Sequence, residues 1–167
     1  GVVMRVPYFC NDSVWNSFRK ELFSWEGTPY RHFQRTKGYG ADCTMFVGQV
    51  YVDMGILHSL SYEYYSRDWH LHTKDTIVED SIIENFNNNV TDKSLSFKRV
   101  LRSDGDWVRG DFLLLAMVNK NIANHMAILL ESGDKMIHAH QRKGVVEDFY
   151  TSPWQRRTKY KVRIFRE

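Results

Sequence analysis

The chain has 167 residues, of which 43% are apolar and 26% are charged, a composition that excludes a disordered chain and suits one folded domain. Its 23 Lys and Arg against 20 Asp and Glu leave a net charge of +3, too little for the dense basic face of a nucleic-acid-binding protein. We therefore predict a single domain over residues 1–167 with no nucleic-acid partner.

Neither a membrane span nor a leader is predicted. The longest unbroken apolar run is Phe112–Val118, whereas a transmembrane helix needs about 20 such residues. The uncharged run after Arg5 reaches Cys10 before polar residues begin, which is too short for the apolar core of a signal peptide. The sequence therefore leaves the localisation of the protein open.

The first part of the chain predicts helices. Asn11, Asp12 and Ser13 are each able to cap a first helix, which Gly27-Thr28-Pro29 ends. The apolar residues of this helix recur at helical spacing and form one face: Val14, Trp15, Phe18, Leu22 and Trp25. A second helix is predicted from Asp42 to about Gly55, and because few charges interrupt it, we expect it to be buried.

The middle of the chain, from Leu57 to Asp106, carries weaker signals. Within it, residues 78–86 predict a short helix, and Asn87-Asn88-Asn89 predicts a loop that follows the helix.

The last part of the chain predicts short strands separated by turns. The strand candidates are Phe112–Met117, His125–Leu130, Lys135–His140, Val145–Tyr150 and Lys159–Phe165, with turns at Gly133-Asp134 and Lys143-Gly144. Helices followed by strands predict an α+β domain with an antiparallel sheet. The last strand alternates apolar and basic side chains, so we expect Lys159, Lys161 and Arg163 to lie on a solvated edge.

Cys43 is a candidate nucleophile because of its position. It follows a glycine-bearing loop and Asp42, and it stands in the first turn of the second predicted helix. Unpaired backbone N–H groups and the helix dipole favour an anion there, which lowers the pKa of a thiol. A buried thiol that only fills the core is the alternative, and a disulfide with Cys10 stays open. Cys10 itself has no such setting.

A thiol nucleophile needs a base, and His125 is the best placed of the seven histidines because it opens an apolar strand. His138 and His140 lie on one face of the next strand, since strand side chains alternate. A two-residue turn at Gly133-Asp134 puts that face on the same side as His125, whereas a one-residue change puts the histidines on opposite faces. If the faces agree, one imidazole is the base and a second orients it.

The histidines also allow a metal site as a weaker alternative. His70-Leu71-His72 and His138-Ala139-His140 are both H-x-H pairs, but neither a cysteine pair nor an H-E-x-x-H motif accompanies them. We therefore predict no metal ion and no cofactor.

Five short segments, in order over about residues 25–165, resemble the NlpC-type cell-wall cysteine peptidases. In that family a G-x-P-Y segment precedes a helix start of the form D-C-[ST]-x-[FL]-[VI], and strands beginning G-D, H-[VA]-[GA]-I and [MF]-[IV]-H-A follow. The matching segments here are Gly27–Tyr30, Gly40–Val47, Gly110–Leu113, Asn124–Ile128 and Met136–Ala139.

The resemblance implies a papain-like α+β fold, with N-terminal helices that pack on the sheet and a nucleophile at a helix start. It implies hydrolysis of the stem peptides of bacterial peptidoglycan, most commonly at the bond from D-γ-glutamate to a diamino acid. Cys43 would attack the scissile carbonyl, and its backbone N–H would be an oxyanion donor. His125 would be the base, and His138 would orient it.

The resemblance also implies substrate contacts. Tyr30 and Asp42 match family positions near the substrate, although Tyr30 could equally be a packing residue and Asp42 a plain helix cap. His140 is assigned to substrate binding and is the fallback for His138 if the hairpin register differs.

A narrower resemblance is to the peptidases of phage-tail and gene-transfer-agent clusters, which implies a phage-tail or cell-wall assembly as a partner. It rests on Tyr65–Trp69, Gly144–Glu147 and Trp154–Arg157. The sequence departs from the family at Thr44, where Ser is commoner, at Met45, where Gly is commoner, and in its long middle segment.

Two further functions stay open. The same thiol chemistry with an acceptor amine or ester makes a transacylase or amidase, because the acyl-enzyme reacts with either nucleophile. A non-catalytic wall-binding or phage-tail module is the other alternative, and the presence of Cys43, His125 and His138 together argues against it.

Overall fold

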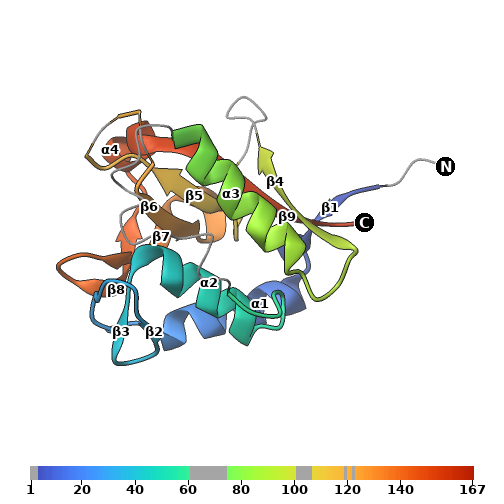
Figure 1. Ribbon diagram of the computed structural model, residues 1–167, viewed down its shortest axis with the longest axis horizontal. Coiled ribbons are helices and arrows are strands. Elements are labelled where there is room, and N and C mark those ends of the chain that lie inside the picture. Colours follow the sequence, from blue (N-terminus) through green and yellow to red (C-terminus); the bar gives the residue numbers. More distant parts are fainter. Residues whose placement is uncertain (1–3, 61–74, 101–106, 119, 122) are drawn as a thin grey trace.

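The computed structural model describes residues 4–60, 75–100, 107–118, 120–121 and 123–167 (Figure 1). The α-helices are α1 (Asp12–Ser24), α2 (Cys43–Asp53), α3 (Asp75–Asn88) and α4 (Ser152–Arg157), and short 3-10 helices η1 and η4 span Tyr8–Cys10 and Glu131–Gly133. The strands are β1 (Val6–Pro7), β2 (Arg35–Thr36), β3 (Gly40–Ala41), β4 (Leu95–Val100), β5 (Phe112–Leu115), β6 (His125–Leu129), β7 (Lys135–His140), β8 (Gly144–Phe149) and β9 (Thr158–Arg166).

The strands form one antiparallel sheet in the order β1-β9-β5-β6-β7-β8, with β4 also paired to β9, and a separate β2–β3 hairpin. Figure 1 shows α1 and α2 together on one side of this sheet, and α2 packs on β6 and β7. The α+β prediction is therefore confirmed. In the part of the chain that the structure describes, no helix is both long and apolar enough to cross a bilayer.

Both N-terminal helices begin where their capping residues predict. The Asn11 side chain accepts a hydrogen bond from the backbone N–H of Val14 (3.0 Å) at the start of α1. The Asp42 carboxylate accepts one from the N–H of Met45 (2.9 Å) at the start of α2. Each side chain satisfies a donor that has no partner inside its helix, which fixes the first turn.

The two faces of the sheet are both covered. The helix side carries the larger apolar cluster, in which Phe18, Phe46, Tyr51 and Phe112 have no exposed surface. The opposite side carries a smaller cluster of buried residues, with Trp107, Met117 and Trp154 packed against it: Leu113, Leu115, Ala127, Leu129, Met136 and Tyr150.

The expected solvated edge at the last strand is wrong. β9 lies inside the sheet, with β5 and β1 on one side and β4 on the other. Arg163 forms a bidentate ion pair with the buried carboxylate of Asp111 (2.8 and 2.9 Å), and Lys161 is buried with its ammonium over the Trp107 ring (4.3 Å). A period of two identifies the faces of a strand, but it does not reveal whether a polar face is later covered.

Two local predictions also need correction. The expected helix over residues 78–86 lies inside the longer α3, which continues through Asn88, so the loop predicted at Asn87-Asn88-Asn89 is wrong for its first two residues. The Asn87 side chain exchanges two hydrogen bonds with the backbone of Phe97 (2.7 and 3.0 Å) and joins the end of α3 to β4. The strands β1 and β4 and the helix α4 were not predicted.

The β6–β7 hairpin has a different turn from the one expected. Ile128 pairs with Ile137 and Leu129 with Met136, and the backbone N–H of Leu130 donates a hydrogen bond to the carbonyl oxygen of Lys135 (2.8 Å). The turn that this bond closes has four residues, 131–134, which include η4, where two were predicted. Adding two residues to the turn preserves which face each side chain occupies. His125 and His138 therefore still project from the same face of the sheet.

We predict that Arg163→Met lowers the free energy of unfolding by about 3–5 kcal/mol, because it leaves the Asp111 carboxylate buried without its cation. Urea unfolding measures the change. Lys98 faces Arg163 across the β4–β9 pairing, so Lys98→Met is the matched control, with an expected change within about 0.5 kcal/mol. Equal effects of the two substitutions would contradict the role of the ion pair.

Candidate active site

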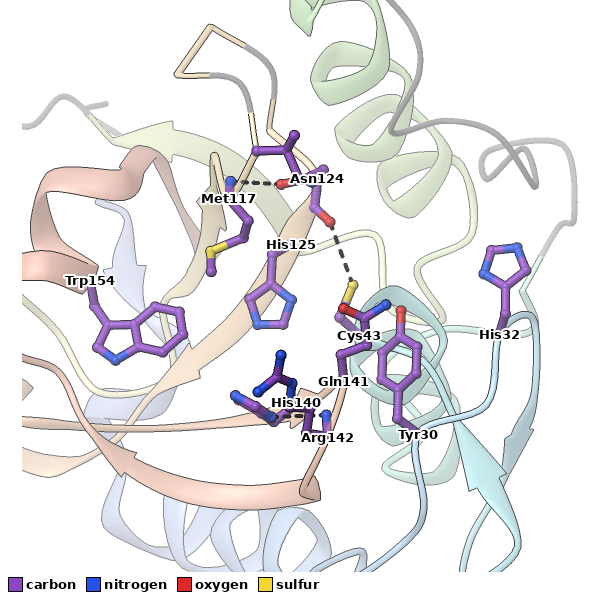
Figure 2. A pocket seen from close by; sticks show the side chains of 11 residues that line it. Tyr30, His32, Cys43, Met117, Asn124, His125, His140, Gln141, Arg142 and Trp154 are labelled. Atoms are coloured by element: carbon purple, nitrogen blue, oxygen red, sulfur yellow. Dashed lines mark hydrogen bonds between the residues drawn. The ribbon is translucent and has the colours of Figure 1, made fainter.

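A pocket of about 530 Å³ opens where α2 begins and β6 starts. Figure 2 shows the side chains around it. The residues that line it are Tyr30, His32, Cys43, Met117, Val118, Asn124, His125, His140, Gln141, Arg142 and Trp154. Four of the residues singled out in the sequence therefore share one cavity: Tyr30, Cys43, His125 and His140. His138 and Asp42 lie behind its wall.

Cys43 is held at the base of the pocket by its helix and by the start of β6. It is the first residue of α2 and is only 3% exposed. Its sulfur lies 3.7 Å from the Thr44 hydroxyl and 4.0 Å from the Asn124 carbonyl oxygen, and the latter contact joins α2 to the strand that begins at His125 (Figure 2). Both cysteines are free, Cys43 buried and Cys10 exposed, so the disulfide alternative is removed.

The prediction that the helix start lowers the pKa of the Cys43 thiol is wrong for the free protein. The pKa of Cys43 is raised to about 12, chiefly by burial and also by the neighbouring Asp42 carboxylate. Hydrogen bonds from the Thr44 hydroxyl and from the backbone of Met126 and Thr44 act in the opposite direction but do not compensate. Desolvation of the sulfur outweighs the helix start, so the thiol is protonated at neutral pH.

His125 and His138 form a hydrogen-bonded pair. The Nε2 atom of His125 lies 2.8 Å from Nδ1 of His138, and the two rings are nearly perpendicular. The described backbone pairing between β6 and β7 covers only residues 128–129 and 136–137, so the imidazoles meet beyond the paired part of the hairpin. Trp154 of α4 covers the pair, with its ring 5.2 Å from His138 and 6.3 Å from His125.

Both imidazoles are neutral at neutral pH. The pKa of His125 is lowered to about 3, chiefly by burial and also by the neighbouring His138 and His140 rings. Burial also lowers the pKa of His138, although the Asp148 carboxylate acts against this. A neutral imidazole beside a protonated thiol is able to accept the proton as the sulfur attacks, which is general-base catalysis.

His140 has a different set of partners from His138. Its Nδ1 atom accepts hydrogen bonds from the backbone N–H groups of Arg142 (3.0 Å) and Lys143 (3.2 Å) in the turn after β7. An Nδ1 atom that accepts two bonds carries no proton, so the neutral ring has its proton on Nε2. His140 therefore presents a hydrogen-bond donor, and its other nitrogen is committed to the turn.

Tyr30 lies at the pocket wall, whereas Asp42 is buried below it. Tyr30 lines the pocket, and burial together with the nearby Cys43 and Asp42 raises the pKa of its hydroxyl, which stays protonated. Asp42 has no exposed surface, and its carboxylate accepts hydrogen bonds from the backbone N–H groups of Phe33 (2.6 Å) and Met45. The structure thus places Asp42 under the pocket as a helix cap that also holds the loop carrying Phe33.

Within the described ranges, no group of three or more His, Cys, Asp or Glu side chains is arranged to hold a metal ion. The His70-Leu71-His72 pair lies outside the described residues, and His138 is hydrogen-bonded on both of its ring nitrogens.

The pocket lining includes residues that were not identified from the sequence, among them Gln141 and Arg142. Two further residues that were not identified contact the imidazole pair. Asp148 on β8 lies 3.2 Å from Nε2 of His138 through its carboxylate, and Trp154 covers the imidazole pair. Strand alternation was the available signal for Asp148, because it lies on the same face as His138 in the β7–β8 register. Trp154 lies on a helix that had not been predicted.

Comparisons with known proteins agree on one family. A family model described as the NlpC/P60 family matches residues 22–163. Three solved structures share the fold at 18% identity: a protein described as similar to a lipoprotein of the NLP/P60 family from Staphylococcus aureus, the NlpC/p60 domain of the peptidoglycan hydrolase SagA, and an NlpC/P60 family protein from Bacillus cereus. No curated protein matches the chain.

The extent of these matches differs. The TM-scores are 0.58, 0.52 and 0.54 in the same order, and the alignments cover 93%, 88% and 90% of this chain. The chain spans 43% of the Staphylococcus aureus protein, 96% of the SagA domain and 38% of the Bacillus cereus protein. The predicted single domain over residues 1–167 stays a prediction.

We predict that Trp154→Ala raises the pKa of His125 from about 3 toward its ordinary value, by at least about one pH unit, because water then reaches the imidazole pair. NMR titration of the His125 ring measures the pKa. Trp154→Phe keeps an aromatic cover and is the control, with a smaller expected rise.

The same substitution should change the acid sensitivity of folding. Since the pKa of His125 is depressed in the folded protein, the unfolded chain takes up that proton first, and stability falls as the pH drops from about 6.5 to about 3. Trp154→Ala should narrow this window. An unchanged His125 titration in Trp154→Ala would show that Trp154 does not control the solvation of the pair.

Proposed function

The chain belongs to the NlpC/P60 family of cysteine peptidases, and from this membership we propose that it hydrolyses a peptide bond in the stem peptides of bacterial peptidoglycan. The observation that carries the proposal is that Cys43, at a helix start, shares one pocket with His125, whose imidazole is hydrogen-bonded to the buried His138. One protein of the same fold is described as a peptidoglycan hydrolase, which agrees with this substrate class.

In the proposed mechanism the Cys43 sulfur attacks the scissile carbonyl while His125 takes the thiol proton. His125 then gives that proton to the leaving amine, and water hydrolyses the resulting thioester. The backbone N–H of Cys43, at the first turn of α2, has no partner inside the helix and is proposed as an oxyanion donor. His138 holds the His125 ring through the 2.8 Å hydrogen bond.

We propose the bond from D-γ-glutamate to a diamino acid as the target. Among the described residues that line the pocket, Arg142 is a permanent cation, and no Asp or Glu accompanies it. A D-γ-glutamyl residue keeps a free α-carboxylate close to the scissile bond, and a guanidinium binds carboxylates well. The charge of the pocket therefore supports this bond over one flanked by neutral residues.

Tyr30 and His140 are the proposed substrate contacts. The neutral Tyr30 hydroxyl and the Nε2–H of His140 both supply hydrogen-bond donors at the pocket wall. Asp42, which the family resemblance also associates with the substrate, is proposed to act through the loop and helix that its carboxylate holds.

An association with a phage tail remains a prediction from the narrower resemblance. Of its three segments, Tyr65–Trp69 lies outside the described residues, Gly144–Glu147 forms most of β8, and Trp154–Arg157 lies in α4. Transfer to an amine or ester acceptor would use the same thioester, so the products of the reaction distinguish a hydrolase from a transacylase.

We expect a muropeptide digest that contains lysine-type and diaminopimelate-type stems to be cleaved between D-glutamate and the diamino acid, with products identified by mass spectrometry. Cys43→Ala should abolish cleavage, and Cys10→Ala should retain it, because Cys10 is exposed and outside the pocket. Cleavage that survives Cys43→Ala would overturn the cysteine-peptidase mechanism, and products carrying an added amine would identify a transacylase.

His138→Ala should lower kcat far more than His140→Ala, by a factor of up to about 10⁴, since the partner of a catalytic base fixes its tautomer and stabilises its charged form. His140→Ala should act mainly on KM. His138 is fully buried, so His138→Gln and thermal unfolding of each variant control for a collapsed site. A nearly normal kcat in His138→Ala together with a strongly lowered kcat in His140→Ala would show that His140, and not His138, is the partner of the base.

A further inference from the structure

The imidazole pair does not end at His138. The Nε2 atom of His138 lies 3.2 Å from the Oδ2 atom of Asp148, so the carboxylate, His138 and His125 form one hydrogen-bonded series. Met136 faces Asp148 and His138 faces Val146 in the β7–β8 pairing, which puts the Asp148 side chain on the face that carries both imidazoles. The Asp148 side chain is 29% exposed, whereas His138 has no exposed side-chain surface.

The series determines where each proton lies. A carboxylate only accepts hydrogen bonds, so the Nε2 atom of His138 must carry the proton that is donated to Asp148. The Nδ1 atom of neutral His138 is then an acceptor, and it receives the Nε2–H of His125. As a result the Nδ1 atom of His125 has a free lone pair, and that nitrogen is the one left to face the pocket that contains Cys43.

Charge adds a second consequence. When His125 accepts the thiol proton, it becomes a cation in a site where burial disfavours any positive charge. The described side chains in ring contact with the pair are His140 and Trp154, and neither supplies a negative charge. Asp148 is the anion hydrogen-bonded to the series, and it stabilises the charge that the two imidazoles share.

We propose that Asp148 is a positioning residue of the active site, which acts through His138 to fix the tautomer of His125 and to stabilise its protonated form. This inference rests on the proposed function. It is separate from the roles of Cys43, His125 and His138, because Asp148 touches neither the thiol nor the pocket.

The competing explanation is that the contact between His138 and Asp148 only stabilises the fold. The tautomers of His138 and His125 distinguish this explanation from a positioning role. ¹⁵N NMR of the histidine rings reports which nitrogen carries the proton, without any substrate. In the wild-type protein we expect His138 and His125 both protonated at Nε2. In Asp148→Ala we expect a mixture of His138 tautomers and, with it, a mixture for His125. A structural role would leave both tautomers unchanged.

Kinetics on a stem peptide that the wild-type enzyme cleaves provide the second measurement. Asp148→Ala should lower kcat by about 10- to 100-fold with little change in KM, the range found when the residue that orients a metal-binding histidine is removed. Asp148→Glu should restore most of the activity. Asp148→Asn keeps the shape but removes the charge, and it should lie between Asp148→Ala and the wild type.

Glu147→Gln is the matched control. Glu147 is the adjacent acidic residue on β8, it points to the other face and it pairs with Lys135 (3.2 Å), so its kcat should stay within about twofold of wild type. If Asp148→Ala does not fold, Asp148→Asn takes its place in both measurements.

The outcomes test the role of Asp148 and the proposed function separately. Wild-type tautomers and a kcat equal to that of Glu147→Gln in a folded Asp148 variant would overturn the inference. Stem-peptide cleavage that persists in Cys43→Ala would overturn the proposed function, whereas the NMR result for Asp148 would still stand.

Discussion

The hydrogen bond between His125 and His138 forms because the two side chains leave adjacent strands on the same face of the sheet. The four-residue turn at 131–134, closed by the hydrogen bond from Leu130 to Lys135, determines this. An even number of turn residues preserves the face, and an odd number would send one imidazole into the helix-side core. The ring contact of Trp154 and the hydrogen bond of Asp148 to His138 both depend on this arrangement.

Burial sets the chemistry of the site more than the helix start does. The Cys43 thiol and the His125 imidazole are both neutral in the free protein, because desolvation raises one pKa and lowers the other. Burial of both groups therefore works against a preformed thiolate–imidazolium pair. The charges appear only when a substrate carbonyl is present to receive the sulfur, so the residues that stabilise charge matter at that moment.

The parts of this site that depend on one short segment were predicted from the sequence, whereas the parts that depend on distant segments were not. The caps at Asn11 and Asp42 and the strands around His125 and His138 follow from side-chain chemistry and spacing that a single segment contains. The interior position of β9 depends on β1 and β4, which come from distant parts of the chain. Nothing in the sequence distinguished Asp148 from other acidic residues on strands. The high pKa of the Cys43 thiol results from burial in the folded protein, which the spacing of residues along the chain does not reveal.

The order of the functional residues along the chain has a consequence for folding. The imidazoles and Asp148 come from one meander, β6-β7-β8, whose contacts join residues that are close in sequence. Cys43 reaches this meander through a contact with Asn124, 81 positions away, and closing so long a loop costs more chain entropy. Contacts between near neighbours form early, whereas distant ones form late. We therefore expect the base to be assembled before the nucleophile arrives, so that a nascent or partly unfolded chain is inert until α2 docks.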